Sequence, residues 1–254
     1  MRLYAIGDIH GHLAKLVDAH REVLADRERT GDGDALVIHL GDLVDRGPDS
    51  RGVIDYMMHG VETGAPWRVI KGNHDRMFTD FVRHAREDDR LWADLHWLHD
   101  RLGGAATLAS YGVVPKLLEK KVTLAKRAAA AVPEAHLRFL EDLPLFHRTD
   151  EVFLVHAGIK PGVPLGEQSE DDLLWIREEF LDDGTDHGHL VVHGHTPVEA
   201  PEHRGNRVAL DTGAAFGGPL TVAVFEGRDV WVLRDGQRYP LLPGEAFSQR
   251  AGSA

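Results

Sequence analysis

The stretch Gly41-Asp42-Leu43-Val44-Asp45-Arg46-Gly47-Pro48 follows an apolar run, residues 35–40, that is typical of a buried strand. Two carboxylates, Asp42 and Asp45, and the guanidinium of Arg46 are thereby gathered on one turn. These charges are unfavourable to place together unless a bound group holds them, and a divalent cation with a phosphate would do so. An ordinary polar turn is the alternative for this stretch taken alone.

Four other stretches repeat the design, in which a predicted strand runs into a polar side chain beside glycine. They are Gly7-Asp8-Ile9-His10-Gly11, Gly72-Asn73-His74-Asp75, His156-Ala157-Gly158 and Gly194-His195. Ligands bind at the carboxyl ends of strands in α/β sheets, and glycine leaves room there for an ion. Two ions that share one carboxylate can polarise a phosphate and activate a water. The five stretches together therefore predict a site for two cations and a phosphate.

Composition limits the possible classes of protein. The 254 residues are 43% hydrophobic, which favours a globular α/β protein. A formal net charge of -12 argues against tight sequence-independent binding to nucleic acid or to an anionic membrane. The chain has no cysteine, so any metal must take oxygen and nitrogen ligands, which suits Mn, Mg, Fe or Zn. No apolar run approaches 18 residues and no signal peptide is evident, so we expect a cytoplasmic protein.

The order of the predicted elements indicates a layered α/β fold in one domain, residues 1–254. Strands are expected at 3–6, 35–40, 67–71, 152–155, 190–192, 208–210, 220–225 and 230–233, and a first helix at 13–27. Residues from about 76 to 148 predict a helical insert, with helices within 80–102 and at 105–111, 114–131 and 133–140. The strand signals stop within this insert. It would either cover the site as a substrate-selecting cap or complete the core.

In series, the five stretches resemble the calcineurin-like metallophosphoesterases, and the Val-Asp-Arg-Gly form at 44–47 is similar to their phosphoprotein phosphatase branch. The resemblance runs from Leu3 to about Phe225. It implies a layered β-sheet sandwich flanked by helices, and a site that holds two divalent metal ions. Mn is the expected metal, with Fe or Zn as alternatives.

The resemblance also implies a role for each residue of the motifs. Asp42 would bridge the two metals, His74 would protonate the leaving oxygen, and Asp45 would orient its imidazole. Arg46 would hold the phosphate, and Arg177 resembles the second phosphate-binding arginine of the family. A metal-bridging hydroxide would attack phosphorus directly, with no phosphoenzyme. The implied ligands of the first metal are Asp8 and His10, those of the second are Asn73, His156 and His195, and Asp42 is shared.

Four residues close to the motifs are expected to support the site without binding metal. His12 would cap or line it, His193 would be a neighbour of the ligand two residues later, Asp75 would cap a helix, and Asp211 would be structural. Further histidines are expected on the surface or in packing: His20, His59, His84, His96, His99, His136, His147 and His203.

The residues at variable positions of the motifs indicate which class of substrate to expect. Asp75, the His156-Ala157-Gly158 motif and the segment 103–112 resemble the bacterial serine/threonine phosphatases more than the eukaryotic ones. We therefore expect a phosphomonoesterase that acts on a phosphorylated protein or small phosphoester, with no nucleic-acid or membrane partner. The rival is the symmetrical diadenosine tetraphosphate hydrolase, which usually lacks an acid at the position of Asp45. An inactive regulatory binding protein is the third alternative, and the intact ligand set argues against it.

Overall fold

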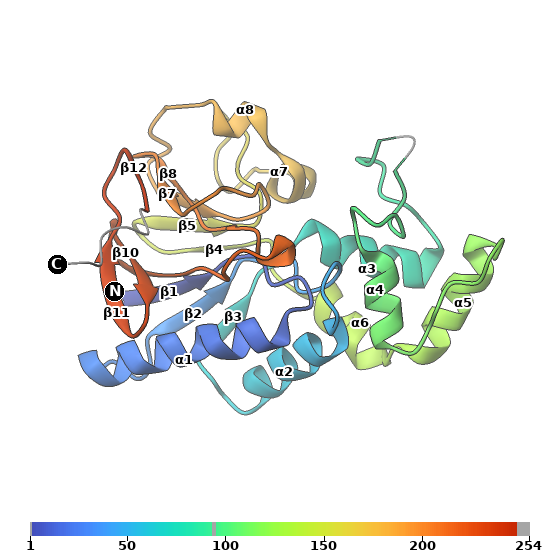
Figure 1. Cartoon of the computed structure of the whole chain (residues 1–254). Helices are drawn as coiled ribbons and strands as arrows, with labels where there is room; N and C mark the ends of the chain where they lie inside the picture. Colours follow the sequence, from blue (N-terminus) through green and yellow to red (C-terminus); the bar gives the residue numbers. More distant parts are fainter. Residues whose placement is uncertain (1, 93–94, 248–254) are drawn as a thin grey trace.

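Two six-stranded sheets form the centre of the computed structural model, which describes residues 2–92 and 95–247 (Figure 1). The first sheet has the order β11-β10-β9-β1-β2-β3 and the second the order β12-β7-β8-β6-β5-β4. The first comprises β1 (Arg2–Ile6), β2 (Leu36–His39), β3 (Trp67–Val69), β9 (Val222–Glu226), β10 (Asp229–Arg234) and β11 (Gln237–Pro240). The second comprises β4 (Phe146–Arg148), β5 (Val152–Val155), β6 (Leu190–His193), β7 (Glu202–His203), β8 (Arg207–Ala209) and β12 (Glu245–Ala246).

The core between the sheets follows from the alternation of side chains along each strand. On β1, Leu3 and Ala5 face the second sheet and pack with Leu154 and Val192, whereas Tyr4 and Ile6 face the other way. The predicted layered sandwich is therefore confirmed. Strands β1, β2 and β3 are parallel to one another, as are β5, β6 and β8, so within each set the carboxyl ends meet at one edge.

Helices cover the outer faces of both sheets. α1 (Leu13–Thr30) places Ala19 and Val23 against the outward side chains of β1 and β9, and α2 (Ser50–Glu62) lies beside it. The short helices α7 (Glu170–Trp175) and α8 (Glu178–Leu181) bury Leu173 and Phe180 against the second sheet. None of the helices in the described part of the chain is long and apolar enough to cross a membrane.

The region of the expected insert carries most of the remaining helices, which are packed together to one side of the sheets (Figure 1). α3 contacts α5 and α6, and α2 contacts α4. Large side chains fill the space between them, among them Phe78, Phe81, Trp97 and Leu140. The four helices are α3 (Asn73–His84), α4 (Gly104–Ser110), α5 (Lys121–Ala131) and α6 (Glu134–Glu141).

Two predicted helices are wrong in extent. The helix expected within 80–102 begins earlier, at Asn73, and ends at His84, because Ala85 is left-handed (φ 51°) and the carboxylate of Asp88 bonds to Arg76 and to the N–H of Arg90. The described residues from 85 to 103 form turns.

The helix expected over 114–131 starts only at Lys121. Pro115 has no N–H to donate, and Leu118 has a φ of 59°, so the chain before Lys121 cannot continue a right-handed helix. Strand signals were also missed: β4 lies inside the range expected to lack strands, and β7, β11 and β12 were not expected. β12 lies near the end of the described residues, where it pairs with β7.

A pair of histidines, the buried His39 and the half-buried His20, lies between α1 and the first sheet. The Nε2 atom of His20 is 2.8 Å from the Nε2 atom of His39. Nδ1 of His39 donates to the carbonyl of Arg68, so its Nε2 must accept from His20, whose Nδ1 then accepts the Tyr56 hydroxyl. With both rings neutral, every hydrogen bond in this chain has a donor and an acceptor. Burial lowers the pKa of His39 to about 4 and the pKa of His20 further.

Acid should therefore destabilise the protein through this pair. An unfolded histidine has a pKa near 6.5, so below that pH the unfolded state binds protons that the folded state excludes. The stabilisation is complete above about pH 6.5 and is lost as the pH falls toward about 4, at about 1.4 kcal/mol per pH unit for each histidine. Urea unfolding at pH 7, 6 and 5 measures the slope. His20→Phe/His39→Leu should flatten it, and the exposed control His59→Gln should not. An unchanged slope in the double variant contradicts the prediction.

Candidate metal and phosphate site

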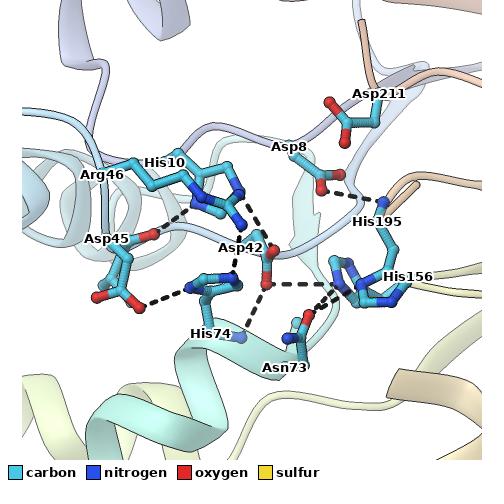
Figure 2. A network of polar contacts seen from close by, with 12 residues as sticks. Asp8, His10, Asp42, Asp45, Arg46, Asn73, His74, His156, His195 and Asp211 are labelled. Atoms are coloured by element: carbon cyan, nitrogen blue, oxygen red, sulfur yellow. Dashed lines mark hydrogen bonds and ion pairs between the residues drawn. The ribbon is translucent and has the colours of Figure 1, made fainter. Parts of the chain in front are cut away.

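The strand ends of both sheets converge on one buried cluster of polar side chains (Figure 2). Asp8 follows β1, Asp42 follows β2, and Asn73 opens α3 just after β3, while the second sheet supplies two histidines after β5 and β6. The structure thus brings together all six residues predicted as metal ligands, and each is at most 6% exposed. They are Asp8, His10, Asp42, Asn73, His156 and His195.

Asp42 lies at the centre of the cluster. Its Oδ2 is 3.3 Å from Nε2 of His10 and its Oδ1 is 3.4 Å from Nε2 of His156. Two groups have ligand atoms within 4.8 Å of one another, His10 with Asp42 and His74, and Asp8 with Asp42 and His156. Asp42 belongs to both groups, as a bridging ligand would. Asp8 groups with His156 here, although the resemblance assigned these two residues to different metals.

Backbone carbonyls orient two of the imidazoles. Nδ1 of His10 donates to the carbonyl of Val44 and Nδ1 of His156 to the carbonyl of Leu40, each at 2.8 Å. A carbonyl can only accept, so the Nε2 lone pairs of both rings must face the cluster. Burial lowers the pKa of both rings, which keeps them neutral and able to bind a cation.

Several acceptor atoms in the cluster lack a donor. Oδ1 of Asp8 and Nε2 of His195 are buried without a hydrogen-bond partner in the part of the chain that the structure describes. Oδ1 of Asn73 accepts from Nδ1 of His195 at 3.1 Å, and the inward-facing Nε2 of His156, itself an acceptor, lies 2.8 Å from the same oxygen. Convergent, buried oxygen and nitrogen acceptors are satisfied by divalent cations, so the residues present fit the predicted metal site.

The electrostatics of the cluster also favour a bound cation, because five carboxylates are buried close together, those of Asp8, Asp42, Asp45, Asp75 and Asp211. Burial and the neighbouring charges of Asp211 and Asp42 raise the pKa of Asp8 well above its usual range. Burial and the charge of Asp42 raise the pKa of Asp75 to about 8. Burial would also raise the pKa of Asp42, but the surrounding imidazoles lower it below its ordinary value. Cations would relieve this repulsion.

Beside the cluster lies the predicted pair for proton transfer. Nδ1 of His74 is 2.6 Å from Oδ2 of Asp45, and both side chains are buried. The guanidinium of Arg46 contacts Nε2 of His10 and lies 3.1 Å from Nε2 of His74 (Figure 2). Arg177 is held by a 3.2 Å hydrogen bond to the Thr196 hydroxyl. The predicted proton donor and first arginine are thus adjacent to the predicted ligands.

Two neighbouring residues take the places expected of them. The carboxylate of Asp75 accepts the N–H groups of Gly72 and Leu43, both at 2.9 Å, so it caps α3. Asp211 accepts the N–H of Gly213 at 2.9 Å.

His193 packs its ring against Phe180, with centroids 5.2 Å apart. His12 precedes α1, but its side chain does not make the capping bond that was one of its expected roles.

Sequence reasoning missed Trp97 and Thr107, which both donate to Asp45. Thr107 lies in a segment that was singled out only for its resemblance, and no local signal marks Trp97.

Comparison with known proteins shows the family to which the chain belongs. The family model described as calcineurin-like phosphoesterase matches residues 1–227, and the chain belongs to this family of metal-dependent phosphoesterases. Serine/threonine-protein phosphatase 1 of Salmonella typhimurium is 27% identical over 228 residues, covering 87% of this chain and 90% of that protein. The asymmetrical bis(5'-nucleosyl)-tetraphosphatase PrpE of Geobacillus thermodenitrificans is 30% identical over 248 residues, covering 87% and 89%.

Solved structures share the fold. The crystal structure of a candidate diadenosine tetraphosphatase aligns with a TM-score of 0.61 at 24% identity, covering 96% of this chain and 95% of that one. A cold-active protein-tyrosine phosphatase from a Shewanella species aligns with a TM-score of 0.58 at 16% identity, covering 95% and 80%. At these identities the likeness establishes the fold alone, which is the fold that the motifs predicted.

Gly72 offers a test of the cluster's packing. A Cβ at this position would lie 2.1 Å from Oδ1 of Asp42 and 2.3 Å from its backbone nitrogen, so Gly72→Ala must displace the shared carboxylate. We expect metal affinity and activity to fall about 10–100-fold. Metal content after dialysis, measured by mass spectrometry, checks this. Gly184→Ala is the control, because a Cβ there meets nothing within 4 Å. Full metal content in Gly72→Ala would mean that Asp42 is not a ligand.

Proposed function

We propose that this phosphoesterase is a serine/threonine phosphatase-like phosphomonoesterase that uses two divalent ions, with Mn as the first choice. The observation that carries the proposal is the buried 2.6 Å contact between His74 and Asp45, beside the Asp42 cluster and within reach of Arg46. A positioned imidazole with a carboxylate partner suits an ester whose leaving oxygen is strongly basic, since that oxygen needs a proton.

The ions would be held by Asp8, His10, Asp42, Asn73, His156 and His195, with Asp42 shared. When bound, they would polarise the phosphate and activate the attacking water.

The remaining work would fall to side chains beside the ions. His74 would carry the proton to the leaving oxygen from Nε2, because Asp45 fixes Nδ1 as a donor and stabilises the charged ring. Arg46 and Arg177 would bind the phosphate oxygens.

A second candidate is hydrolysis of a dinucleoside tetraphosphate. It is favoured by the 30% identity to a relative named as an asymmetrical bis(5'-nucleosyl)-tetraphosphatase. The rival expected from the motifs was a symmetrical hydrolase, so the nucleotide alternative now concerns the asymmetrical reaction. An inactive binding protein would turn over neither class of substrate.

A substrate panel tests the proposal. After chelation the protein should be inactive, and Mn should restore it most strongly. The restored enzyme should then have a higher kcat/KM on a phosphoserine peptide than on diadenosine tetraphosphate, with a phosphotyrosine peptide and a phosphodiester as further members of the panel. Preference for the tetraphosphate would favour the second candidate, and full activity in a verified metal-free sample would rule out both.

His74→Asn tests the role of the imidazole. Both metals should remain bound, because His74 is not among the proposed ligands. Turnover of a phosphoserine peptide should fall about 10²–10⁴-fold, the usual contribution of positioned proton transfer. The loss should be smaller for p-nitrophenyl phosphate, whose phenolate leaves without needing the proton as much. An equal loss on both substrates together with loss of metal would make His74 a ligand instead.

A further inference from the structure

The helical insert reaches into the site at the turn that carries Asp45 and Arg46. We propose that Trp97, Gly103 and Thr107 of the insert are positioning residues, which hold this aspartate–arginine pair in the geometry that the reaction uses. The inference rests on the proposed function, and it assigns to the insert a role in proton transfer and phosphate binding.

Two donors from the insert fix the carboxylate of Asp45. Oγ1 of Thr107 donates to Oδ1 at 2.6 Å, and Nε1 of Trp97 donates to Oδ2 at 2.8 Å. Nδ1 of His74 donates to the same Oδ2 at 2.6 Å. A carboxylate bound on both oxygens by buried donors cannot rotate, so the insert determines the direction in which Asp45 presents its acceptor to the imidazole.

The insert also stabilises an unfavourable backbone. Asp45 and Arg46 have φ values of 73° and 65°, in the left-handed region that side chains other than glycine rarely adopt. The Thr107 hydroxyl accepts the N–H of Asp45 at 2.8 Å, and the Gly103 carbonyl accepts the N–H of Arg46 at 3.3 Å. The two backbones touch at this point, because a Cβ on Gly103 would lie 2.2 Å from the nitrogen of Arg46.

The donors themselves are rigidly held. Trp97 is fully buried, and its ring lies 4.7 Å from Phe81 and 5.8 Å from Phe78, measured between centroids. Both phenylalanines belong to α3, the helix whose first turn carries His74. The same helix therefore positions the imidazole directly and its carboxylate partner through Trp97.

The position of Thr107 allows a test with matched variants. Thr107→Val keeps the shape but loses both hydrogen bonds to Asp45 and a third with the Ser50 hydroxyl, whereas Thr107→Ser keeps the hydroxyl. On a phosphoserine peptide, Thr107→Val should lower kcat about 10–100-fold, as removal of an orienting partner does, and Thr107→Ser should stay within about threefold. The loss should be smaller on p-nitrophenyl phosphate. Thr123→Val, an exposed site elsewhere in the insert, should match the wild type.

A second measurement needs no substrate. The short Nδ1–H contact of His74 with Asp45 should give a downfield proton resonance in NMR spectra, assigned by its loss in His74→Asn. It should persist in Thr107→Ser and in the control, and shift or broaden in Thr107→Val and in Trp97→Phe, which lacks the indole N–H.

The outcomes separate the inference from the proposed function. If the wild type does not hydrolyse the phosphoserine peptide, the proposed function is wrong. The proton resonance of His74 then still tests whether the insert positions Asp45. An unchanged resonance in both Thr107→Val and Trp97→Phe would overturn the inference. So would a loss of kcat that is as large in Thr107→Ser as in Thr107→Val, with metal content and melting temperature unchanged.

Discussion

Crowding of negative charge around one buried carboxylate is the constraint on which this structure depends. Asp42 is 2% exposed and shares its surroundings with four further buried acids, Asp8, Asp45, Asp75 and Asp211. Burying these groups is unfavourable unless donors and cations compensate them. The fold provides that compensation by directing strand ends from two different sheets to one point, with two imidazoles turned inward by carbonyls of the chain. The backbones of Gly41 (φ 91°) and Gly72 are in contact beside Asp42. A Cβ on Gly41 would overlap the backbone of Gly72, and a Cβ on Gly72 would overlap Asp42.

Much of the cluster could be predicted from sequence, because its signals are local. A short apolar run followed by glycine and a polar side chain marks the carboxyl end of a buried strand, and parallel strands bring such ends to one edge. Asp8, Asp42 and Asn73 follow three strands that the structure shows to be parallel neighbours in one sheet, which is why the local signal and this rule place them together. The pairing of His74 with Asp45 was predicted from the resemblance to a family, and in the structure the two side chains are in contact.

Other features depend on contacts that no window of sequence contains. Thr107 and Asp45 are 62 positions apart, and the pairing of His20 with His39 requires a helix to lie on the correct strand. The misjudged helices of the insert have a related cause. Their composition is amphipathic, but hydrogen bonds such as that from the N–H of Arg90 to the carboxylate of Asp88 compete with helical turns, and only the folded chain decides between them.

The contact of Gly103 with Arg46 means that the insert is not an exchangeable module. A loop grafted between α3 and β4 would have to reproduce a glycine carbonyl, a hydroxyl and an indole at the turn before the active centre could form. This constraint applies to the part of the insert that touches the turn. Exposed positions beyond Gly112, such as Leu117 and Leu118, are free of it, so they can be replaced without disturbing Asp45 or Arg46.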